Sequence, residues 1–151
     1  MTEIGFFPAA LSSFLGTLGF AVLVHAPKRA LLPASLSGMA AFLIAWLLAH
    51  LGVSEAAAIF CGSLAGSLTG LSLARHLRMI GTVYLMMSIV SFVPGLGLYR
   101  CMEYFGAGEA RLGAETLIQA MITIVMIVMG QALGSFIDRA LHTRQRRKPA
   151  A

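Results

Sequence analysis

The chain has 151 residues, of which 58% are hydrophobic and only 11% are charged, and its formal net charge is +5. Soluble domains contain about 25% charged residues, so this composition excludes an ordinary soluble domain and indicates a protein embedded in a lipid bilayer. The basic residues lie in short clusters between apolar segments rather than on one polar face, which excludes a nucleic-acid-binding surface.

Five segments of the chain are long and apolar enough to cross a bilayer, which requires about 20 residues. None of the five contains Asp, Glu, Lys or Arg. The sequence therefore predicts an all-α integral membrane protein with about five transmembrane helices. In chain order, the predicted spans are 5–26, 30–51, 56–74, 79–98 and 116–137.

The connections between the spans predict the orientation of the chain, because cytoplasmic loops are enriched in Lys and Arg. If the first and third loops and the C-terminal tail lie on one side of the membrane, Arg100 and Arg111 are the only Lys or Arg residues on the other side. We expect the N-terminus outside and the C-terminus inside, with a transmembrane domain at 1–138 and a basic cytoplasmic tail at 139–151. The basic residues on the inner side are then Lys28, Arg29, Arg75, Arg78, Arg139, Arg144, Arg146, Arg147 and Lys148.

The third span contains a regular glycine pattern. Gly62, Gly66 and Gly70 repeat every four residues and therefore form one smooth groove along a helix. Small residues let helix backbones approach closely in a membrane, so close helix packing is the preferred interpretation. The alternative is that the polar residues of this span line a substrate path: Ser63, Ser67 and Thr69.

The fourth span is predicted to break near its outer end, at Pro94 and Gly95. Proline lacks a backbone N–H and clashes with the preceding helical turn. Transporters use such broken helices to hold substrates, although a purely structural kink is an equally good interpretation. The polar face that leads into the break consists of Tyr84, Ser88 and Ser91.

The fifth span carries a stripe of small and polar residues on an otherwise apolar surface. Gln119, Thr123, Gly130 and Gly134 share one face of a regular helix, and Gln131 lies off that face. Helix packing is the preferred interpretation and ligand binding is the alternative. The connection before this span, 99–115, is the longest in the chain and is rich in glycine, so it is expected to be a loop.

The sequence shows no pattern typical of a catalytic, metal or cofactor site. It has no plausible nucleophile–base pair and no phosphate-binding loop. The histidines lie at or beyond span ends, without a spacing that favours metal binding. We therefore expect neither an enzyme nor a bound cofactor. The histidines are His25, His50, His76 and His142.

Two short runs resemble signatures of a known family. The run from Gly19 to Leu31, which contains Pro27-Lys-Arg29, is similar to the first-loop signature of the threonine/serine exporter (ThrE) family. The Pro94-Gly95-x-x-x-Tyr99 run is similar to a proline–glycine signature of the same family, in its short split-type (YjjB-like) subunit, which corresponds to the C-terminal half. The length, the span layout and the basic tail also fit this subunit.

This resemblance implies one subunit of a two-component exporter in the bacterial inner membrane. The implied substrates are threonine and serine, or a C4 dicarboxylate such as succinate, and the implied partner is a larger membrane subunit of the same family. If the partner contributes a similar unit of opposite orientation, substrate would bind between the two units. We then expect the glycine groove of the third span and the break in the fourth to face that partner.

Two arginines are candidate guides for substrate carboxylates, Arg29 at the inner mouth and Arg100 at the outer mouth, because a guanidinium group matches a carboxylate. The preferred interpretation of Arg29 is that it fixes the topology, and that of Arg100 is that it anchors the chain at the membrane interface. Two other functions stay open: an assembly subunit that transports nothing, and a small homo-oligomeric channel. The basic tail fixes topology and, as an alternative, binds anionic membrane lipid.

Overall fold

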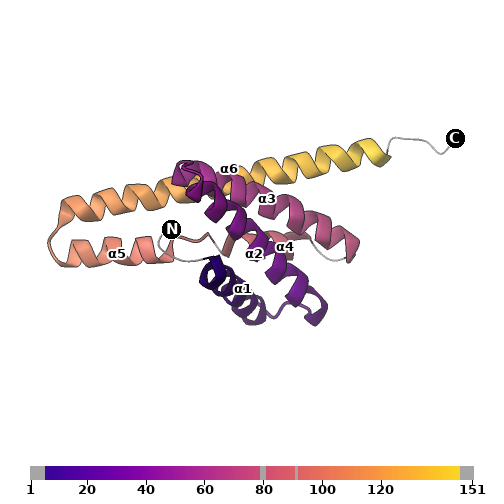
Figure 1. Ribbon diagram of the computed structural model, residues 1–151, viewed down its shortest axis with the longest axis horizontal. Helices are drawn as coiled ribbons and strands as arrows, with labels where there is room; N and C mark the ends of the chain where they lie inside the picture. The colour runs from indigo at the N-terminus through magenta and orange to yellow at the C-terminus, as the bar shows by residue number, and fades with distance from the viewer. Residues whose placement is uncertain (1–5, 79–80, 91, 147–151) are drawn as a thin grey trace.

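Helices account for almost all of the described structure. The computed structural model describes residues 6–78, 81–90 and 92–146, and within these ranges the chain forms six α-helices and no β-strand (Figure 1). The prediction of an all-α protein is therefore confirmed. The helices are α1 (Phe6–Leu23), α2 (Lys28–His50), α3 (Glu55–His76), α4 (Gly81–Val90), α5 (Gly95–Gly106) and α6 (Ala110–Arg146).

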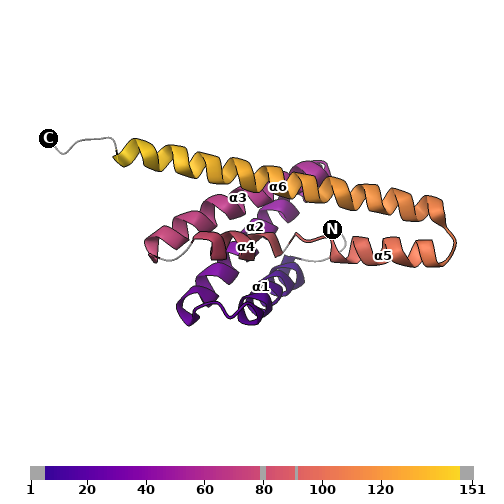
Figure 2. The same cartoon turned by 180° about the vertical axis from the view of Figure 1, so that it is seen from behind.

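Helix α3 is central, with α2, α4 and α6 packed against it (Figures 1 and 2). The contacts between α2 and α3 fix their relative direction. Gly62 lies against Ala45, and Gly66, one turn later, lies against Ala41. Since the residue numbers of these contacts rise along α3 while they fall along α2, the two helices are antiparallel, as expected for helices joined by a short turn.

Helices α3 and α6 run parallel to each other although they are distant in sequence. Gly130 lies against Ser63, and Gly134 lies against Ser67. The residue numbers of these contacts rise together along α3 and α6, so both helices run in the same direction. The last helix therefore returns along the third one and packs directly on its small-residue face.

Small side chains dominate the buried core, which forms two clusters. Alanine and glycine at helix contacts let the backbones approach closely, which is how helices gain packing energy where lipid supplies no hydrophobic drive. The first cluster contains Ala21, Ala30, Ala34, Ala74, Tyr84 and Met87. The second contains Ala41, Ala45, Ile59, Phe92 and Ile127.

The predicted break in the fourth span is confirmed. Helix α4 ends at Val90, and α5 begins at Gly95, directly after Pro94. The axes on the two sides of the break differ by 46°. Proline has no N–H to continue the helical ladder, so the chain leaves the helix before it and starts a new one after it. Ser91 lies outside the described residues.

The expected loop at 99–115 is wrong, because α5 and α6 form a helical hairpin there. Only residues 107–109 connect the two helices, with Gly108 at a φ of +79°, a conformation that glycine adopts easily. Two glycines of the hairpin helices permit close contact: Gly97 lies against Ala120, and Gly113 lies against the ring of Phe105. Gly108 therefore serves the tight turn, and Gly97 and Gly113 serve helix packing.

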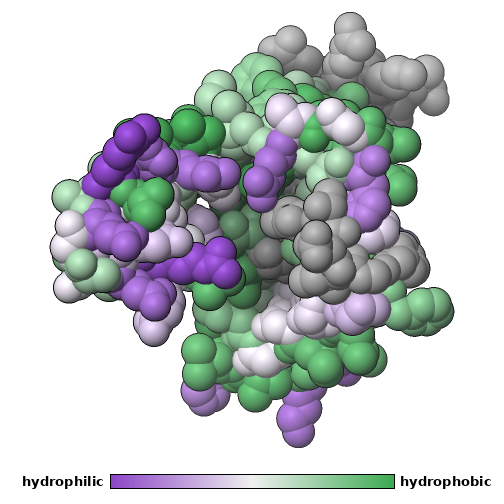
Figure 3. Space-filling model, turned by 60° about the vertical axis from the view of Figure 1, so that its left-hand side comes forward, coloured by the Kyte–Doolittle hydropathy of each residue, from purple (hydrophilic) through white to green (hydrophobic). Residues whose placement is uncertain are grey.

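Three described helices are long and apolar enough to cross a membrane: α2, α3 and the Ala110–Leu141 part of α6. The bent α4–α5 pair makes a fourth candidate, and the apolar Ala10–Leu23 part of α1 is shorter. Five spans therefore remain a prediction. Figure 3 shows hydrophobic side chains over much of one face of the bundle, and hydrophilic side chains gathered toward the end of the α5–α6 hairpin.

Helix α6 is longer than one membrane crossing requires. Its 37 residues extend over about 55 Å, whereas the hydrocarbon core of a bilayer is about 30 Å thick. Its last turns, through Arg146, include the first part of the predicted tail. The remaining tail residues, from 147 onward, lie outside the described residues.

Candidate functional site

A cavity of about 370 Å³ opens between the start of α3, the α4–α5 break and the N-terminal half of α6. Of the residues singled out in the sequence, the structure brings together Pro94, Arg100, Gln119 and Thr123 around it. They come from segments that are far apart in the chain, and the proline break is part of the cavity wall. This cavity is the best candidate for a ligand site.

Helix α6 supplies a polar wall. Thr116, Gln119, Ala120 and Thr123 face the cavity, and their spacing of three, four and seven residues places them on one face of the helix. Thr116 Oγ1 donates to the carbonyl of Leu112 at 2.8 Å, and Thr123 Oγ1 donates to that of Gln119 at 3.1 Å. Because both hydroxyl protons are used, the two oxygens can act toward a ligand only as acceptors.

The break and α5 supply the second wall. Pro94 precedes the first residue of α5, and Leu96 and Gly97 of its first turn line the cavity. The first N–H groups of a helix have no partner within the helix and carry a partial positive charge. One turn farther on, Arg100 adds a full positive charge to the same wall.

The third wall carries a carboxylate. Glu55 is the first residue of α3 and lines the cavity together with Ile59, one turn later. Glu55 and Arg100 are both exposed, and in the described part of the chain no ion pair joins them. The cavity therefore presents two opposite charges, neither of which neutralises the other.

The floor of the cavity is apolar and closed. Ile59 and Phe92 line the cavity and are also members of the second core cluster, with exposed fractions of 3% and 4%. Ile127 of α6 completes this layer. The layer separates the cavity from the polar contacts deeper in the bundle.

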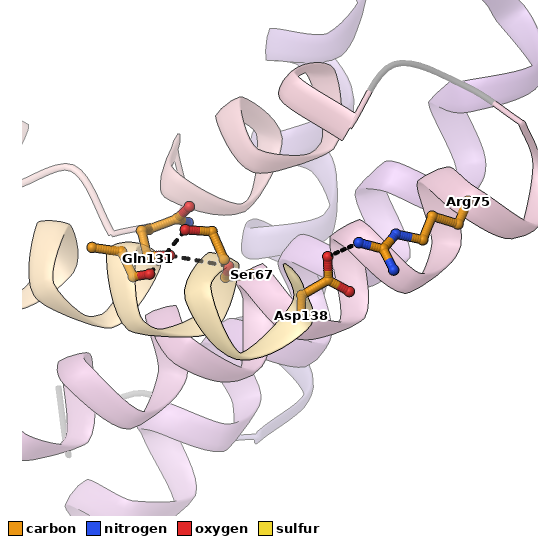
Figure 4. A network of polar contacts seen from close by, with 6 residues as sticks. Ser67, Arg75, Gln131 and Asp138 are labelled. Carbon is orange, nitrogen blue, oxygen red and sulfur yellow. Dashed lines mark hydrogen bonds and ion pairs between the residues drawn. The ribbon is translucent and has the colours of Figure 1, made fainter. Parts of the chain in front are cut away.

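Below the floor, polar side chains join α3, α4 and α6. Gln131 Nε2 donates to Ser88 Oγ at 2.7 Å, and Ser67 Oγ donates to the backbone carbonyl of Gln131 at 3.3 Å (Figure 4). Ser67 and Ser88 are fully buried. These hydrogen bonds hold the three helices in register and leave the two serines in a packed interior rather than beside open space.

An ion pair connects α3 and α6 at the opposite end of the bundle from the cavity. Arg75 Nη2 donates to Asp138 Oδ2, and Figure 4 shows the two side chains pointing toward each other. The Asp138 side chain is 5% exposed, and that of Arg75 is 38% exposed. A buried carboxylate needs such a partner to offset its loss of hydration.

The glycine groove of α3 is filled by the chain itself. A Cβ on Gly62 would lie 2.7 Å from Ala45 Cβ and 2.9 Å from the carbonyl oxygen of Ala41. A Cβ on Gly66 would lie 2.8 Å from Ala41 Cβ and 3.1 Å from Ser88 Cβ. Since α2 and α4 occupy this groove, the expectation that it faces a partner subunit is wrong.

Four other predicted residues lie away from the cavity. Ser63 and Tyr84 are fully buried, the first with its hydroxyl bonded to the helix backbone and the second against Gly70. Thr69 is on the exposed side of α3, and Arg29 is exposed in the first turn of α2. Within the described ranges, no group of three or more His, Cys, Asp or Glu side chains is placed to hold a metal ion.

Three residues of interest were not predicted as part of a site. By the limits of the predicted spans, Glu55 lies in the second loop, Asp138 directly follows the last span, and Gln131 lies off the polar stripe. A stronger signal was available for Gln131, because a glutamine in an apolar span needs a hydrogen-bond partner. The positions of Glu55 and Asp138 depend on the parallel packing of α3 and α6, which no local pattern reveals.

Comparison with known proteins gives one family. The family described as Threonine/Serine exporter, ThrE, matches residues 9–137, which is most of the chain. No curated protein and no solved structure matches the chain.

Proposed function

We propose that this chain, which belongs to the threonine/serine exporter family, ThrE, is one membrane subunit of a two-component exporter of small polar metabolites. Membership in this family and the long apolar helices make the chain a membrane-embedded transporter protein. Beyond this, we propose a bacterial inner-membrane location and five spans, with the N-terminus outside and the C-terminus inside. The cavity between α3, α5 and α6 is the proposed substrate site.

The cavity at the broken helix is the observation that carries this proposal. Transporters commonly bind substrates where a membrane helix is interrupted, because the start of the second half-helix attracts anionic groups. Here the interruption at Pro94 faces a polar stripe of α6 that includes Gln119 and Thr123. A continuous apolar helix would offer a small polar substrate neither charge nor hydrogen bonds.

The closed floor supports a carrier rather than an open channel. Ile59 and Phe92 block the cavity toward the interior, so passage of a substrate requires a conformational change. In an alternating-access carrier, a site open to one side is closed to the other in each state. Under the proposed orientation, the cavity opens toward the outside, as expected for a state that has released its substrate.

The incomplete cover of the α5–α6 hairpin supports a partner subunit. Helix α5 packs against α6, and no other described helix makes a comparable contact with it. Its apolar residues Leu96 and Met102 are 65% and 76% exposed. A second membrane subunit beside this hairpin would cover them and enclose the open side of the cavity.

Efflux measurements test the proposed function. Cells that express this chain, its candidate partner, or both are loaded with labelled serine, threonine or succinate. Efflux that requires both proteins is the expected result. Efflux with this chain alone would favour a homo-oligomeric carrier, and no efflux from assembled complexes would favour an assembly subunit.

A matched pair of threonine variants tests the site. Thr123→Val removes a hydroxyl from the cavity wall, whereas Thr69→Val removes one from the exposed side of α3. Both hydroxyls bond to their own helix, so the two substitutions are chemically alike. Loss of one substrate hydrogen bond is expected to slow efflux about fivefold for Thr123→Val. Equal effects of both variants would contradict the assigned site.

A further inference from the structure

The exposed flank of α3 carries an open groove of about 500 Å³ near the C-terminal end of the helix. We propose that this groove binds an anionic phospholipid, with its acyl chains along Leu68, its ester groups at Ser72 and its phosphate at His76 and Arg78. The inference goes beyond the proposed transport function and concerns a different part of the molecule from the cavity. The groove is lined by Leu68, Thr69, Ser72, Leu73 and His76.

This flank of α3 faces away from the neighbouring helices. Gly66 lies against α2, and Ser67 lies against Gly134 of α6. At about 100° per residue, Ser72 lies about 120° and about 140° around the helix from these two positions. Ser72 and His76 are accordingly exposed. Hydroxyl and imidazole groups on a flank that faces lipid need a polar partner, because hydrocarbon offers them no hydrogen bond.

Successive turns of the groove match the successive chemical groups of a phospholipid. The first turn holds Leu68 and Thr69, the second holds Ser72 beside Leu73, and the third holds His76. Each turn advances by about 5.4 Å along the helix. A phospholipid presents acyl chains, ester carbonyls and a phosphate in the same order. A free phosphate ion would use only the last turn, so the whole groove favours a lipid.

The groove offers hydrogen-bond donors at the two levels where a phospholipid has acceptors. Thr69 Oγ1 donates to the carbonyl of Ala65 at 2.8 Å, so this hydroxyl has no proton left for a ligand. In contrast, the Ser72 hydroxyl and the His76 ring make no hydrogen bond with the described part of the chain. Each has an O–H or N–H to donate. Ester carbonyls and phosphate oxygens are acceptors that satisfy both.

The charge at this end of the bundle also favours an anion. Since α2 and α3 are antiparallel, the start of α2 and the end of α3 lie at the same end (Figure 1). Among the described residues there, Asp138 is the one acid, and it is already paired with Arg75. Arg78 is exposed and makes no ion pair with the described part of the chain. The described basic residues at this end are Lys28, Arg29, Arg75, Arg78 and Arg139.

Side chains rather than the backbone must hold the phosphate. The C-terminus of a helix carries a partial negative charge, so the end of α3 does not itself attract an anion. The full positive charge of Arg78 and the donor of His76 have to outweigh it. Basic pockets beside membrane helices bind anionic lipid headgroups in this way. Removal of these two side chains is therefore expected to abolish the preference for an anionic lipid.

Photocrosslinking in a bilayer tests the proposal. The full chain, purified with any subunit that stays bound, is placed in phosphatidylcholine nanodiscs with a trace of phosphatidylglycerol that carries a photoreactive acyl chain. We expect the label on residues 65–76, about fivefold above that from a matched phosphatidylcholine probe, because the choline group places a cation among basic side chains. Unlabelled phosphatidylglycerol should compete, and inorganic phosphate should not.

Exposed substitutions separate the two levels of the groove. Ser72→Ala is expected to lower labelling by both lipids up to about fivefold, since both have ester groups and one hydrogen bond is lost. The double variant His76→Gln with Arg78→Gln is expected to label equally with both lipids. The matched controls, Ser135→Ala and Arg111→Gln, remove a hydroxyl and a charge that do not line the groove. They are expected to label like the wild type.

Three results would overturn the lipid site. One is equal labelling of the wild type by the two lipids, and another is a label spread evenly over the exposed helices. The third is crosslinking of this flank to a protein subunit in place of lipid. Competition by inorganic phosphate as strong as that by phosphatidylglycerol would likewise assign the end of α3 to a soluble anion. Each of these results is independent of whether the protein transports amino acids.

Discussion

The contact between Gly134 of α6 and Ser67 of α3 predicts a substitution that destabilises the protein and a second one whose cost is not additive with the first. A Cβ on Gly134 would lie 2.7 Å from both Cβ and Oγ of Ser67 and 3.1 Å from the carbonyl oxygen of Leu64. Carbon atoms in good contact are about 3.5–4.0 Å apart. The Ser67 hydroxyl can rotate away, but its Cβ is fixed to the backbone, so the two helices must separate by about 1 Å.

The expected cost of Gly134→Ala follows from this separation. Overpacked sites lose typically 1–3 kcal/mol, and the fixed Cβ of Ser67 places this site near the middle, at about 2 kcal/mol. Ser67→Gly removes the obstructing Cβ, but it places a glycine inside a helix and loses the hydrogen bond to the Gln131 carbonyl, so it costs about 2 kcal/mol by itself. We expect the double variant to lose about 2 kcal/mol rather than the sum of about 4, because the space for the new methyl group is now present.

Reversible unfolding of the purified protein in mixed micelles, titrated with SDS, measures these differences in free energy. The control is Gly19→Ala, since a Cβ on Gly19 meets nothing within 4 Å. It is expected to leave stability unchanged or to raise it by about 0.5–1 kcal/mol. Strictly additive losses in the double variant, or no loss for Gly134→Ala alone, would refute the close parallel packing of α3 and α6.

Two other stability predictions use the same unfolding measurement. Gln131→Leu removes the 2.7 Å hydrogen bond to Ser88 and is expected to cost about 1 kcal/mol. Ser88→Ala is expected to cost more, because it leaves the amide donor of Gln131 without its partner. A larger loss for Gln131→Leu than for Ser88→Ala would contradict this hydrogen bond. Arg75→Gln is expected to destabilise the protein more than Asp138→Asn does. Arg75→Gln leaves the Asp138 carboxylate, which is 5% exposed, without its guanidinium partner. After Asp138→Asn, the Arg75 side chain, which is 38% exposed, can turn toward water. Equal losses for these two variants would show that the ion pair is hydrated in the membrane.

Local chemistry made part of the fold and of the site predictable. Pro94 disrupts a helix wherever it stands in a span, so the break followed from the residue itself. Gln119 and Thr123 share a helical face by their spacing alone. These features require no knowledge of which helices are neighbours.

Other features depend on tertiary contacts and could not be predicted in this way. The charges between Arg100 and Glu115 interrupt the hydropathy pattern, so that segment resembles a loop in the sequence. It folds as a hairpin because α5 finds a partner in α6. Likewise, Asp138 stands next to a basic segment and resembles a tail residue, and only its contact with Arg75 shows that it is buried.

The long-range contact between α3 and α6 also sets the order in which the chain folds during its synthesis. Ser67 and Gln131 are 64 residues apart in the chain. At about 5–20 residues per second, a ribosome needs about 3–13 s to produce the segment between them. During that interval Ser67 and Arg75 lack their partners on α6, and a nascent chain that stops there leaves the α6-facing side of α3 uncovered. Helix α6 therefore completes the bundle by covering the small-residue face of α3.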